Sequence, residues 1–288
     1  MAAASGVTVR PSAGAEPGPA RSPGSLSLRV VSALALAPPA IAAAWFGWPW
    51  LPLVTALAGL GMAWEWARLC RAGAVGLSGF VLIGCVLAAT AAAATAGIAG
   101  ALALSLVGAA SVFFVARRER GGDPLWLAAG ALWVAVPCVL LLWLARAAGG
   151  GRLTVLWIFA IVWATDIGAF AAGRRIGGPR LAPRWSPHKT WAGLLGGTLC
   201  AALAGWATAG LVDASSALPL VLASAGLALV EQFGDLAESV AKRRFGVKDS
   251  SGLIPGHGGL LDRLDGLLAV VPVAALISLL GGGVLAWR

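Results

Sequence analysis

Three carboxylates and a lysine share one helical stripe in the last third of the chain. Glu231, Asp235, Glu238 and Lys242 are separated by four, three and four residues, so in a helix their side chains lie on one face. Neighbouring carboxylates repel each other unless a cation neutralises them. Mg²⁺ commonly takes one or two protein carboxylates and completes its shell with water and substrate phosphate. The spacing therefore predicts a magnesium site, and the alternative is a solvated helix face with a Glu–Lys pair.

A glycine-rich loop and a second charged cluster follow this stripe. In chain order its notable residues are Lys248, Asp249, Gly256, His257, Gly258, Gly259, Asp262, Arg263 and Asp265. Glycines let backbone N–H groups approach an anion, and a helix that begins just after them offers its positive end. Bases interleaved with carboxylates suit a metal–polyphosphate complex, because the metal bridges phosphate oxygens and the cations stabilise the remaining charge.

Two further positions carry polar side chains at the edge of apolar runs. A carboxylate such as Asp166 costs about 2.5–3.5 kcal/mol at the centre of a membrane helix, which favours a functional role over a merely hydrated position. Ser186, Lys189 and Thr190 directly precede another apolar run, where they are candidates for phosphate contact. Ser186 could instead cap the following helix.

The elements that position these residues are predicted to be membrane helices. Of the 288 residues, 59% are hydrophobic and 11% are charged, whereas soluble domains carry about 25% charged residues. We predict an all-α, polytopic transmembrane bundle with about nine spans. The predicted spans are 28–46, 50–67, 76–95, 98–116, 124–144, 153–172, 190–211, 217–237 and 266–286. Residues 1–27 are rich in Gly, Pro, Ala and Ser and are predicted to be a disordered tail, which leaves 28–288 as the membrane domain.

The distribution of basic residues predicts the orientation. With nine spans and a cytoplasmic N-terminus, 18 of the 21 Lys and Arg residues lie on the cytoplasmic side, and only Arg146, Arg152 and Arg288 face outward. The predicted site therefore faces the cytoplasm. Topology and anionic lipids also explain the net charge of +9 more simply than nucleic-acid binding does. Four single cysteines without a CxxC pair argue against zinc or a disulfide framework.

The 27 residues at 239–265 closely resemble the signature of phosphatidate cytidylyltransferases, also called CDP-diacylglycerol synthases. The run around Asp166, the Ser-Pro-x-Lys-Thr segment at 186–190 and Glu65 between two tryptophans are also similar to that family. The resemblance covers roughly residues 50–288. One departure is His188, which stands where the family often has a second lysine.

The resemblance implies a helical inner-membrane enzyme, typically a homodimer, that uses CTP, phosphatidic acid and Mg²⁺. The phosphate of phosphatidic acid would attack the α-phosphorus of CTP and release pyrophosphate, with the catalytic part at about 153–288. By position, the metal ligands would be Asp235, Asp262 and Asp265, with Asp249 in support. Phosphates and substrate would be bound by Asp166, Ser186, Lys189, Thr190, Glu238, Ser239, Lys242, Arg243, Lys248, His257, Gly258, Gly259 and Arg263.

Two other functions compete with this interpretation. A CTP-dependent lipid-alcohol kinase would pass the γ-phosphoryl group to an alcohol, and the continuous match through Asp265 argues against it. An anion transporter should scatter its charged residues over several central spans, whereas here they crowd onto two cytoplasmic segments.

Overall fold

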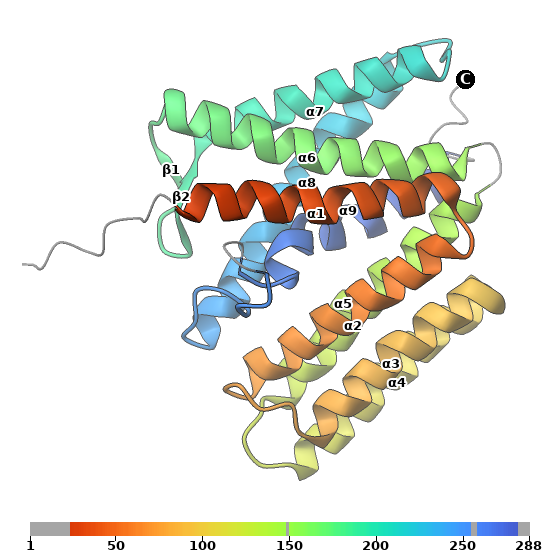
Figure 1. The fold of residues 1–288 in the computed structure, drawn as a ribbon, viewed down its shortest axis with the longest axis vertical. Helices are drawn as coiled ribbons and strands as arrows, with labels where there is room; N and C mark the ends of the chain where they lie inside the picture. The colour runs from red at the N-terminus through yellow and green to blue at the C-terminus, as the bar shows by residue number, and fades with distance from the viewer. Residues whose placement is uncertain (1–23, 148–149, 255–257, 282–288) are drawn as a thin grey trace, which may run out of the picture.

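The structure is a computed structural model that describes residues 24–147, 150–254 and 258–281, with side chains from residue 35 onward. Within these ranges the chain forms nine helices. They are α1 (Gly24–Phe46), α2 (Trp50–Cys70), α3 (Gly76–Thr95), α4 (Ile98–Arg118), α5 (Pro124–Arg146), α6 (Gly151–Arg175), α7 (Trp191–Leu211), α8 (Leu218–Arg244) and α9 (Leu261–Leu280). Figure 1 shows α2–α5 as one group and α6–α8 as another, with α1 and α9 between them.

Each predicted apolar range overlaps one described helix, with residues 282–286 of the last range outside the described residues, and the polytopic helical fold is confirmed. Seven described helices, α3 to α9, are long and apolar enough to cross a membrane. The count of nine spans and the cytoplasmic N-terminus stay predictions. Helix α9 begins at residue 261 rather than 266 and so includes the Asp262–Asp265 segment. Residues 1–23 of the predicted disordered tail lie outside the described residues, helix α1 begins at Gly24, and the tail stays a prediction.

A short hairpin interrupts the helical chain between α6 and α7. Strand β1 (Arg180–Ala182) pairs antiparallel with β2 (Ser186–Thr190), and Arg180 lies opposite Thr190. The strands are too short to show the alternating pattern from which a strand is predicted. Thr190, rather than Ser186, caps α7, because its Oγ1 accepts a hydrogen bond from the N–H of Gly193 at 3.0 Å.

Two groups of buried side chains hold the helices together. One joins α2–α5, and the other joins α5 and α6 to α7–α9, so that α9 contributes Leu268 to the first and Val271 to the second. Small residues bring the backbones of α6, α7 and α8 close together. A Cβ added at Gly197 would lie 2.9 Å from Thr165 O, and one at Gly205 would lie 2.6 Å from Leu220 O. Close approach through small residues is typical of helices packed in lipid.

A salt-bridged corner joins the ends of α2, α3 and α4. Glu119 accepts hydrogen bonds from the N–H groups of Leu77 and Ser78 at 2.7 and 3.0 Å, and Arg71 Nη1 lies 3.0 Å from its Oε2. Burial raises the pKa of Glu119, but the hydrogen bonds from Ser78 and Leu77 and the charge of Arg71 outweigh it, so its pKa is lowered.

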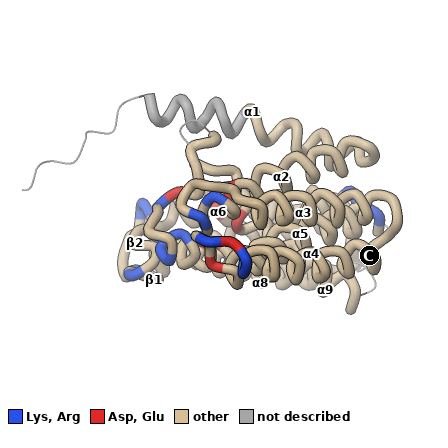
Figure 2. The backbone as a smooth tube through the Cα atoms, turned by 90° about the horizontal axis from the view of Figure 1, so that it is seen from below, with Lys and Arg blue, Asp and Glu red and all other residues tan. Residues whose placement is uncertain are grey.

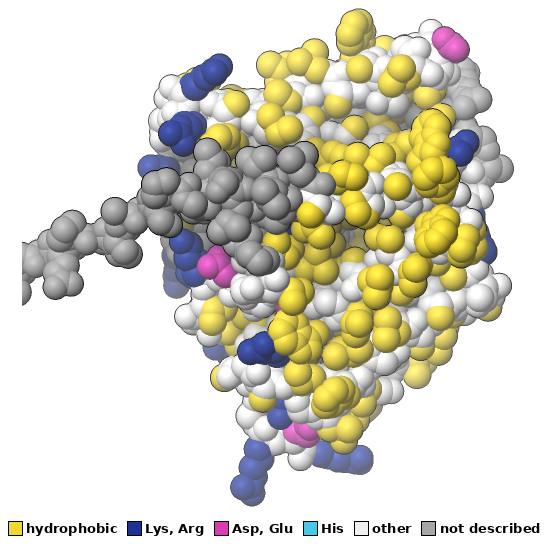
Figure 3. Space-filling model, viewed as in Figure 1, with side chains coloured by type: hydrophobic (Ala, Val, Ile, Leu, Met, Phe, Trp, Pro, Cys, Tyr) yellow, Lys and Arg dark blue, Asp and Glu magenta, His cyan; other side chains and the backbone are white. Residues whose placement is uncertain are grey.

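Charged and apolar side chains occupy different parts of the surface. Figure 2 shows most of the coloured charged positions at the end of the bundle that carries β1 and β2. Apolar side chains cover much of the flank seen in Figure 3, as expected for a surface that faces lipid. The end of the molecule that carries the hairpin therefore holds the candidate site.

Candidate active site at one end of the bundle

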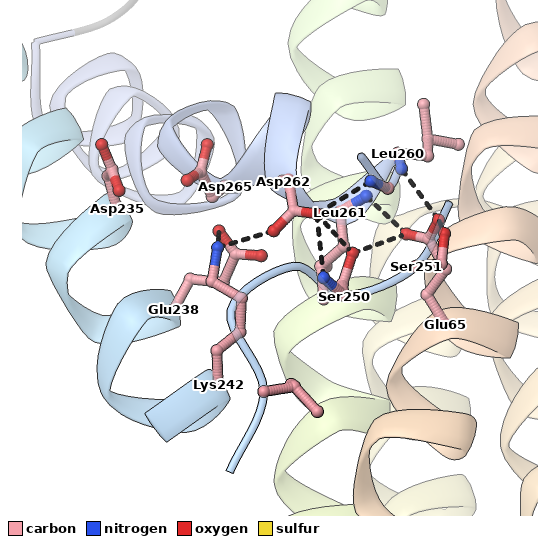
Figure 4. Close-up of polar contacts among 12 residues, drawn as sticks. Glu65, Asp235, Glu238, Lys242, Ser250, Ser251, Leu260, Leu261, Asp262 and Asp265 are labelled. Atoms are coloured by element: carbon pink, nitrogen blue, oxygen red, sulfur yellow. Dashed lines mark hydrogen bonds and ion pairs between the residues drawn. The ribbon is translucent and has the colours of Figure 1, made fainter. Parts of the chain in front are cut away.

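Residues far apart in the chain meet where α9 begins. Figure 4 shows Glu65 from α2 and Lys242 from α8 on opposite sides of the loop that leads into α9. Asp235, Glu238 and Asp265 lie on the α8 side of this junction. The carboxylate stripe and the second charged cluster predicted from the sequence are therefore brought together, with the loop residues 249–254 and 258–260 between them and Glu65.

The Asp262 carboxylate anchors this loop to α8 and α9 through hydrogen bonds. Its Oδ1 accepts a hydrogen bond from Lys242 Nζ at 2.6 Å. Its Oδ2 accepts hydrogen bonds from the N–H and the hydroxyl of Ser250, both at 2.9 Å, and from the N–H of Gly259 at 2.8 Å. The side chain is only 4% exposed. Both oxygens thus have protein donors, and metal binding by Asp262, which stays a prediction, would require at least Lys242 to move.

The Glu65 carboxylate on α2 anchors the same loop through hydrogen bonds from the side opposite α8. Its carboxylate is fully buried and accepts hydrogen bonds from the N–H groups of Leu260 and Leu261 at 2.8 and 2.6 Å. The hydroxyls of Ser250 and Ser251 donate to it at 3.4 and 2.6 Å. A buried anion is stabilised at a helix N-terminus, where unpaired N–H groups and the helix dipole converge.

The loop glycines approach anions as predicted, but these anions belong to the protein. A Cβ at Gly259 would lie 1.9 Å from Ser250 Oγ and 2.8 Å from Glu65 Oε1. Gly258 has a φ of +85°, and a Cβ there would lie 3.0 Å from Asp262 Oδ2. The start of α9, which the sequence offered as a phosphate site, is therefore occupied by Glu65. Glycine is needed here mainly because two carboxylates pack against the backbone.

A second group of carboxylates lies between α6, α8 and α9. Asp235 is 30% exposed and forms an ion pair with Lys189 at 2.5 Å, while Lys189 Nζ also donates to Gln232 Oε1 at 3.2 Å. Gln232 in turn donates to buried Glu231 at 2.7 Å. Asp166 is exposed and interacts electrostatically with Asp235, Glu231, Lys189 and Arg263. One lysine from the hairpin thus connects the carboxylates of two helices.

Glu238 is a buried acid on the α8 side of the site. It is 1% exposed, and Lys242 Nζ lies 3.5 Å from its Oε2. Neither carboxylate oxygen accepts a hydrogen bond from any described residue. Asp265 lies beside Glu238 and is also electrostatically coupled to Asp235. Glu238 thus pairs with Lys242 and also faces Asp265, and such a cluster of buried carboxylates is a favourable surrounding for a cation.

The donor set fits Mg²⁺, although no preformed cage is present. No three His, Cys, Asp or Glu side chains among the described residues already converge as metal ligands. Mg²⁺ needs only one or two carboxylates when water and phosphate supply the other oxygens. Asp235 and Asp265, both partly exposed and close to Glu238, meet that requirement.

The remaining predicted residues differ in their exposure and contacts. Arg243, Lys248, Asp249 and Arg263 are exposed, and Ser186 and Ser239 are partly buried. Arg243 donates to the carbonyl of Val247 at 3.3 Å, and Thr190 is used as a helix cap. His257 lies outside the described residues. Gln232 was absent from the predicted site. Glu231 belonged to the predicted carboxylate stripe without a separate role, and Glu65 was noted only for the family resemblance, as a lone acid between two tryptophans.

Comparison with known proteins identifies the family. A family model described as "Cytidylyltransferase family" matches residues 27–280. A phosphatidate cytidylyltransferase of Brucella suis biovar 1 is 36% identical over 265 residues, which cover 89% of this chain and 93% of that protein. Another, of Haemophilus influenzae, is 42% identical over 127 residues, 42% of this chain and 44% of its own. One of Staphylococcus epidermidis is 44% identical over 128 residues, 44% of this chain and 49% of its own. The chain therefore belongs to the cytidylyltransferase family of enzymes.

Proposed function

We propose that this protein transfers the cytidylyl group of CTP to phosphatidic acid, with CDP-diacylglycerol and pyrophosphate as products, in phospholipid biosynthesis. The single observation that carries the proposal is the meeting of two elements at one end of a membrane bundle. They are the loop residues 249–254 and 258–260, anchored by Glu65 and Asp262, and the carboxylate group of α6, α8 and α9. Relatives that match nearly the whole chain carry this activity in their names.

Mg²⁺ is the proposed cofactor, and Asp235 and Asp265 are its first candidates as ligands. When bound, the ion would neutralise phosphate charge on the nucleotide. Asp262 joins the ligand set only if Lys242 leaves its Oδ1. Glu238 would add negative charge behind these ligands without reaching solvent.

The cations of the site have separate proposed roles. Lys189, held between Asp235 and Gln232, is positioned to exchange its carboxylate partner for a substrate phosphate. Exposed Arg243, Lys248 and Arg263 would attract CTP and the lipid headgroup. No covalent nucleophile is required, because the lipid phosphate attacks the α-phosphorus itself and pyrophosphate leaves. The protein would therefore contribute to catalysis mainly by orienting the two substrates and by stabilising the phosphate charge.

We place the active end at the cytoplasmic face of the inner membrane, because 18 of the 21 basic residues fall on that side of the nine-span topology. Membrane lipids would surround the apolar flank. A homodimer is proposed on the family resemblance alone, and light scattering of the protein–detergent complex tests it.

Product analysis tests the proposed activity. The purified protein is incubated with CTP labelled at the α-phosphate, phosphatidic acid and Mg²⁺. The proposal predicts label in the lipid fraction and release of pyrophosphate. In a parallel incubation a lipid alcohol replaces phosphatidic acid. If the alcohol becomes phosphorylated and the α-label stays in CDP, while phosphatidic acid takes up no label, the protein is a kinase and the proposal is wrong.

A further inference from the structure

An open pocket of about 400 Å³ lies between the end of α2 and the loop that Glu65 anchors. Trp64, Arg68 and Leu69 of α2 line one side of it, and loop residues 250–253 line the other. None of the described carboxylates lines this pocket. It is therefore separate from the proposed substrate site, although the two share the loop.

Arg68 is the cation of this pocket, and it is held in place without a carboxylate partner among the described residues. Its Nε donates a hydrogen bond to the carbonyl of Gly73 at 3.0 Å, and its guanidinium lies over the ring of Trp64, 4.6 Å from the ring centre. Neither Nη nitrogen has a hydrogen-bond acceptor among the described residues. A guanidinium with two such nitrogens binds phosphate oxygens through charge-assisted hydrogen bonds. The pocket thus offers a fixed group for binding phosphate.

An exposed apolar stripe on α2 leads to this arginine. Leu53, Leu57, Leu60, Trp64 and Arg68 are separated by four, three, four and four residues, so they share one face of the helix. The three leucines are 51%, 59% and 38% exposed. Leu57 lies about 16 Å from Arg68 along the helix axis, which is about the hydrocarbon depth of one leaflet. Apolar side chains, then a tryptophan, then an arginine follow the order of acyl chains, interface and headgroup in a bilayer.

The second wall of the pocket depends on the docked position of the loop. The hydroxyls of Ser250 and Ser251 donate to Glu65 at 3.4 and 2.6 Å, and Ser251 Oγ accepts a hydrogen bond from the N–H of Leu253 at 3.0 Å. If the loop leaves Glu65, this wall is lost. A ligand that contacts both walls therefore binds the docked loop more tightly than the undocked one, and its binding stabilises the docked position.

We propose that this pocket binds the phosphate of an anionic phospholipid that is not a substrate, and that the bound lipid holds the loop in its docked position. The acyl chains of this lipid lie along the apolar stripe of α2. A lipid fits better than a free phosphate ion, because Trp64, Leu69, Phe245, Val247 and Leu253 give the pocket a largely apolar lining. The inference goes beyond the proposed function, since it concerns a separate lipid whose binding can be measured without turnover.

Hydrogen exchange of the loop tests the inference. The protein is placed in nanodiscs of dioleoyl phosphatidylcholine, with or without dioleoyl phosphatidylglycerol. Exchange is followed at the amides of residues 250 and 259–261, which donate to Asp262 and Glu65. We expect phosphatidylglycerol to slow this exchange by about fivefold, the gain expected for one basic residue beside anionic lipid. Arg68→Gln should lose the effect, and Arg68→Lys should keep it in part. The amides of Leu77 and Ser78, bound by Glu119, report folding in each variant.

Arg117→Gln is the matched control. Arg117 also lies over an aromatic ring four residues earlier, that of Phe113, near the end of α4, but it does not line this pocket. This variant should respond to phosphatidylglycerol as the wild type does.

The inference is overturned if Arg68→Gln keeps the wild-type response, or if Arg117→Gln loses it to the same extent. Inorganic phosphate, added to nanodiscs of phosphatidylcholine alone, should leave the exchange unchanged. If it slows exchange as much as phosphatidylglycerol does, the ligand is a soluble anion and the lipid assignment is wrong. Absence of turnover would refute the proposed function and leave these exchange results standing.

Discussion

Replacing Glu65 by glutamine is the sharpest perturbation of the site, because it keeps the side-chain volume and removes one buried charge. The carboxylate accepts hydrogen bonds from two backbone N–H groups, one from Leu260 and one from Leu261, and each oxygen serves one of them. An amide presents an oxygen to only one of these donors. The other N–H then faces an NH₂ group and loses its partner.

The expected cost follows from that single loss. An unpaired buried N–H costs about 1–3 kcal/mol, so a central value of about 2 kcal/mol lowers the ratio of docked to undocked loop by about 30-fold. Loss of the charge at the helix N-terminus acts in the same direction. We expect faster hydrogen exchange at the amides of Ser250 and Gly259–Leu261, together with a lower kcat.

Glu119→Gln is the matched control for this experiment. Glu119 also accepts hydrogen bonds from two backbone N–H groups at the start of a helix, but at α3 rather than at the loop. It should destabilise the protein without changing exchange at 250–261. Unchanged exchange and full activity in Glu65→Gln would refute the role of Glu65 as the loop anchor.

Three further predictions concern the loop and the α2–α4 corner. Gly259→Ala places a methyl group 1.9 Å from Ser250 Oγ and should lower turnover by at least about tenfold. Gly252→Ala is the control, because the space around Gly252 is open, and it should keep wild-type turnover. Equal turnover in the two variants would contradict the packing argument. Asp262→Asn should reduce both thermal stability and kcat, because an NH₂ group replaces one carboxylate oxygen and then faces groups that are themselves hydrogen-bond donors. A variant that is stable but inactive would favour a direct role of Asp262 in metal binding. The lowered pKa of Glu119 means that its stabilisation is present above its ordinary value of 4.5 and is lost as pH falls through the lowered pKa. The difference in Tm between wild type and Glu119→Gln should therefore disappear in acid, and a difference that persists there would contradict this.

The helices could be predicted from the sequence because their signal is local. Each apolar range of about 20 residues became a helix, and the i, i+4 spacing correctly placed Asp235, Glu238 and Lys242 along α8. The boundaries of α9 were less predictable, since Asp262 and Asp265 made its first turns look like loop. The β1–β2 hairpin had no pattern to find, because five residues of Ser-Pro-His-Lys-Thr carry no strand periodicity.

The internal connections of the site could not be predicted, because they depend on tertiary structure. Glu65 contacts residues 185 to 196 positions later in the chain, and no local pattern indicates which donors it meets. For the same reason, the glycines predicted a bound anion without revealing that Glu65 and Asp262 supply it. Gln232 was missed as a site residue, and Glu231 was predicted only as part of the carboxylate stripe, because the link from Gln232 to Lys189 spans 43 positions and reaches the hairpin.

The dependence of turnover on Mg²⁺ tests the central claim most directly. CDP-lipid formation is measured over a range of Mg²⁺ concentrations for the wild type, for Asp235→Asn and for Asp213→Asn, an exposed carboxylate that follows the far end of α7. We predict that the wild type and Asp213→Asn share one Mg²⁺ dependence, while Asp235→Asn needs far more Mg²⁺ or loses turnover. An unchanged Mg²⁺ dependence and full turnover in Asp235→Asn would contradict a metal–nucleotide site between α8 and α9.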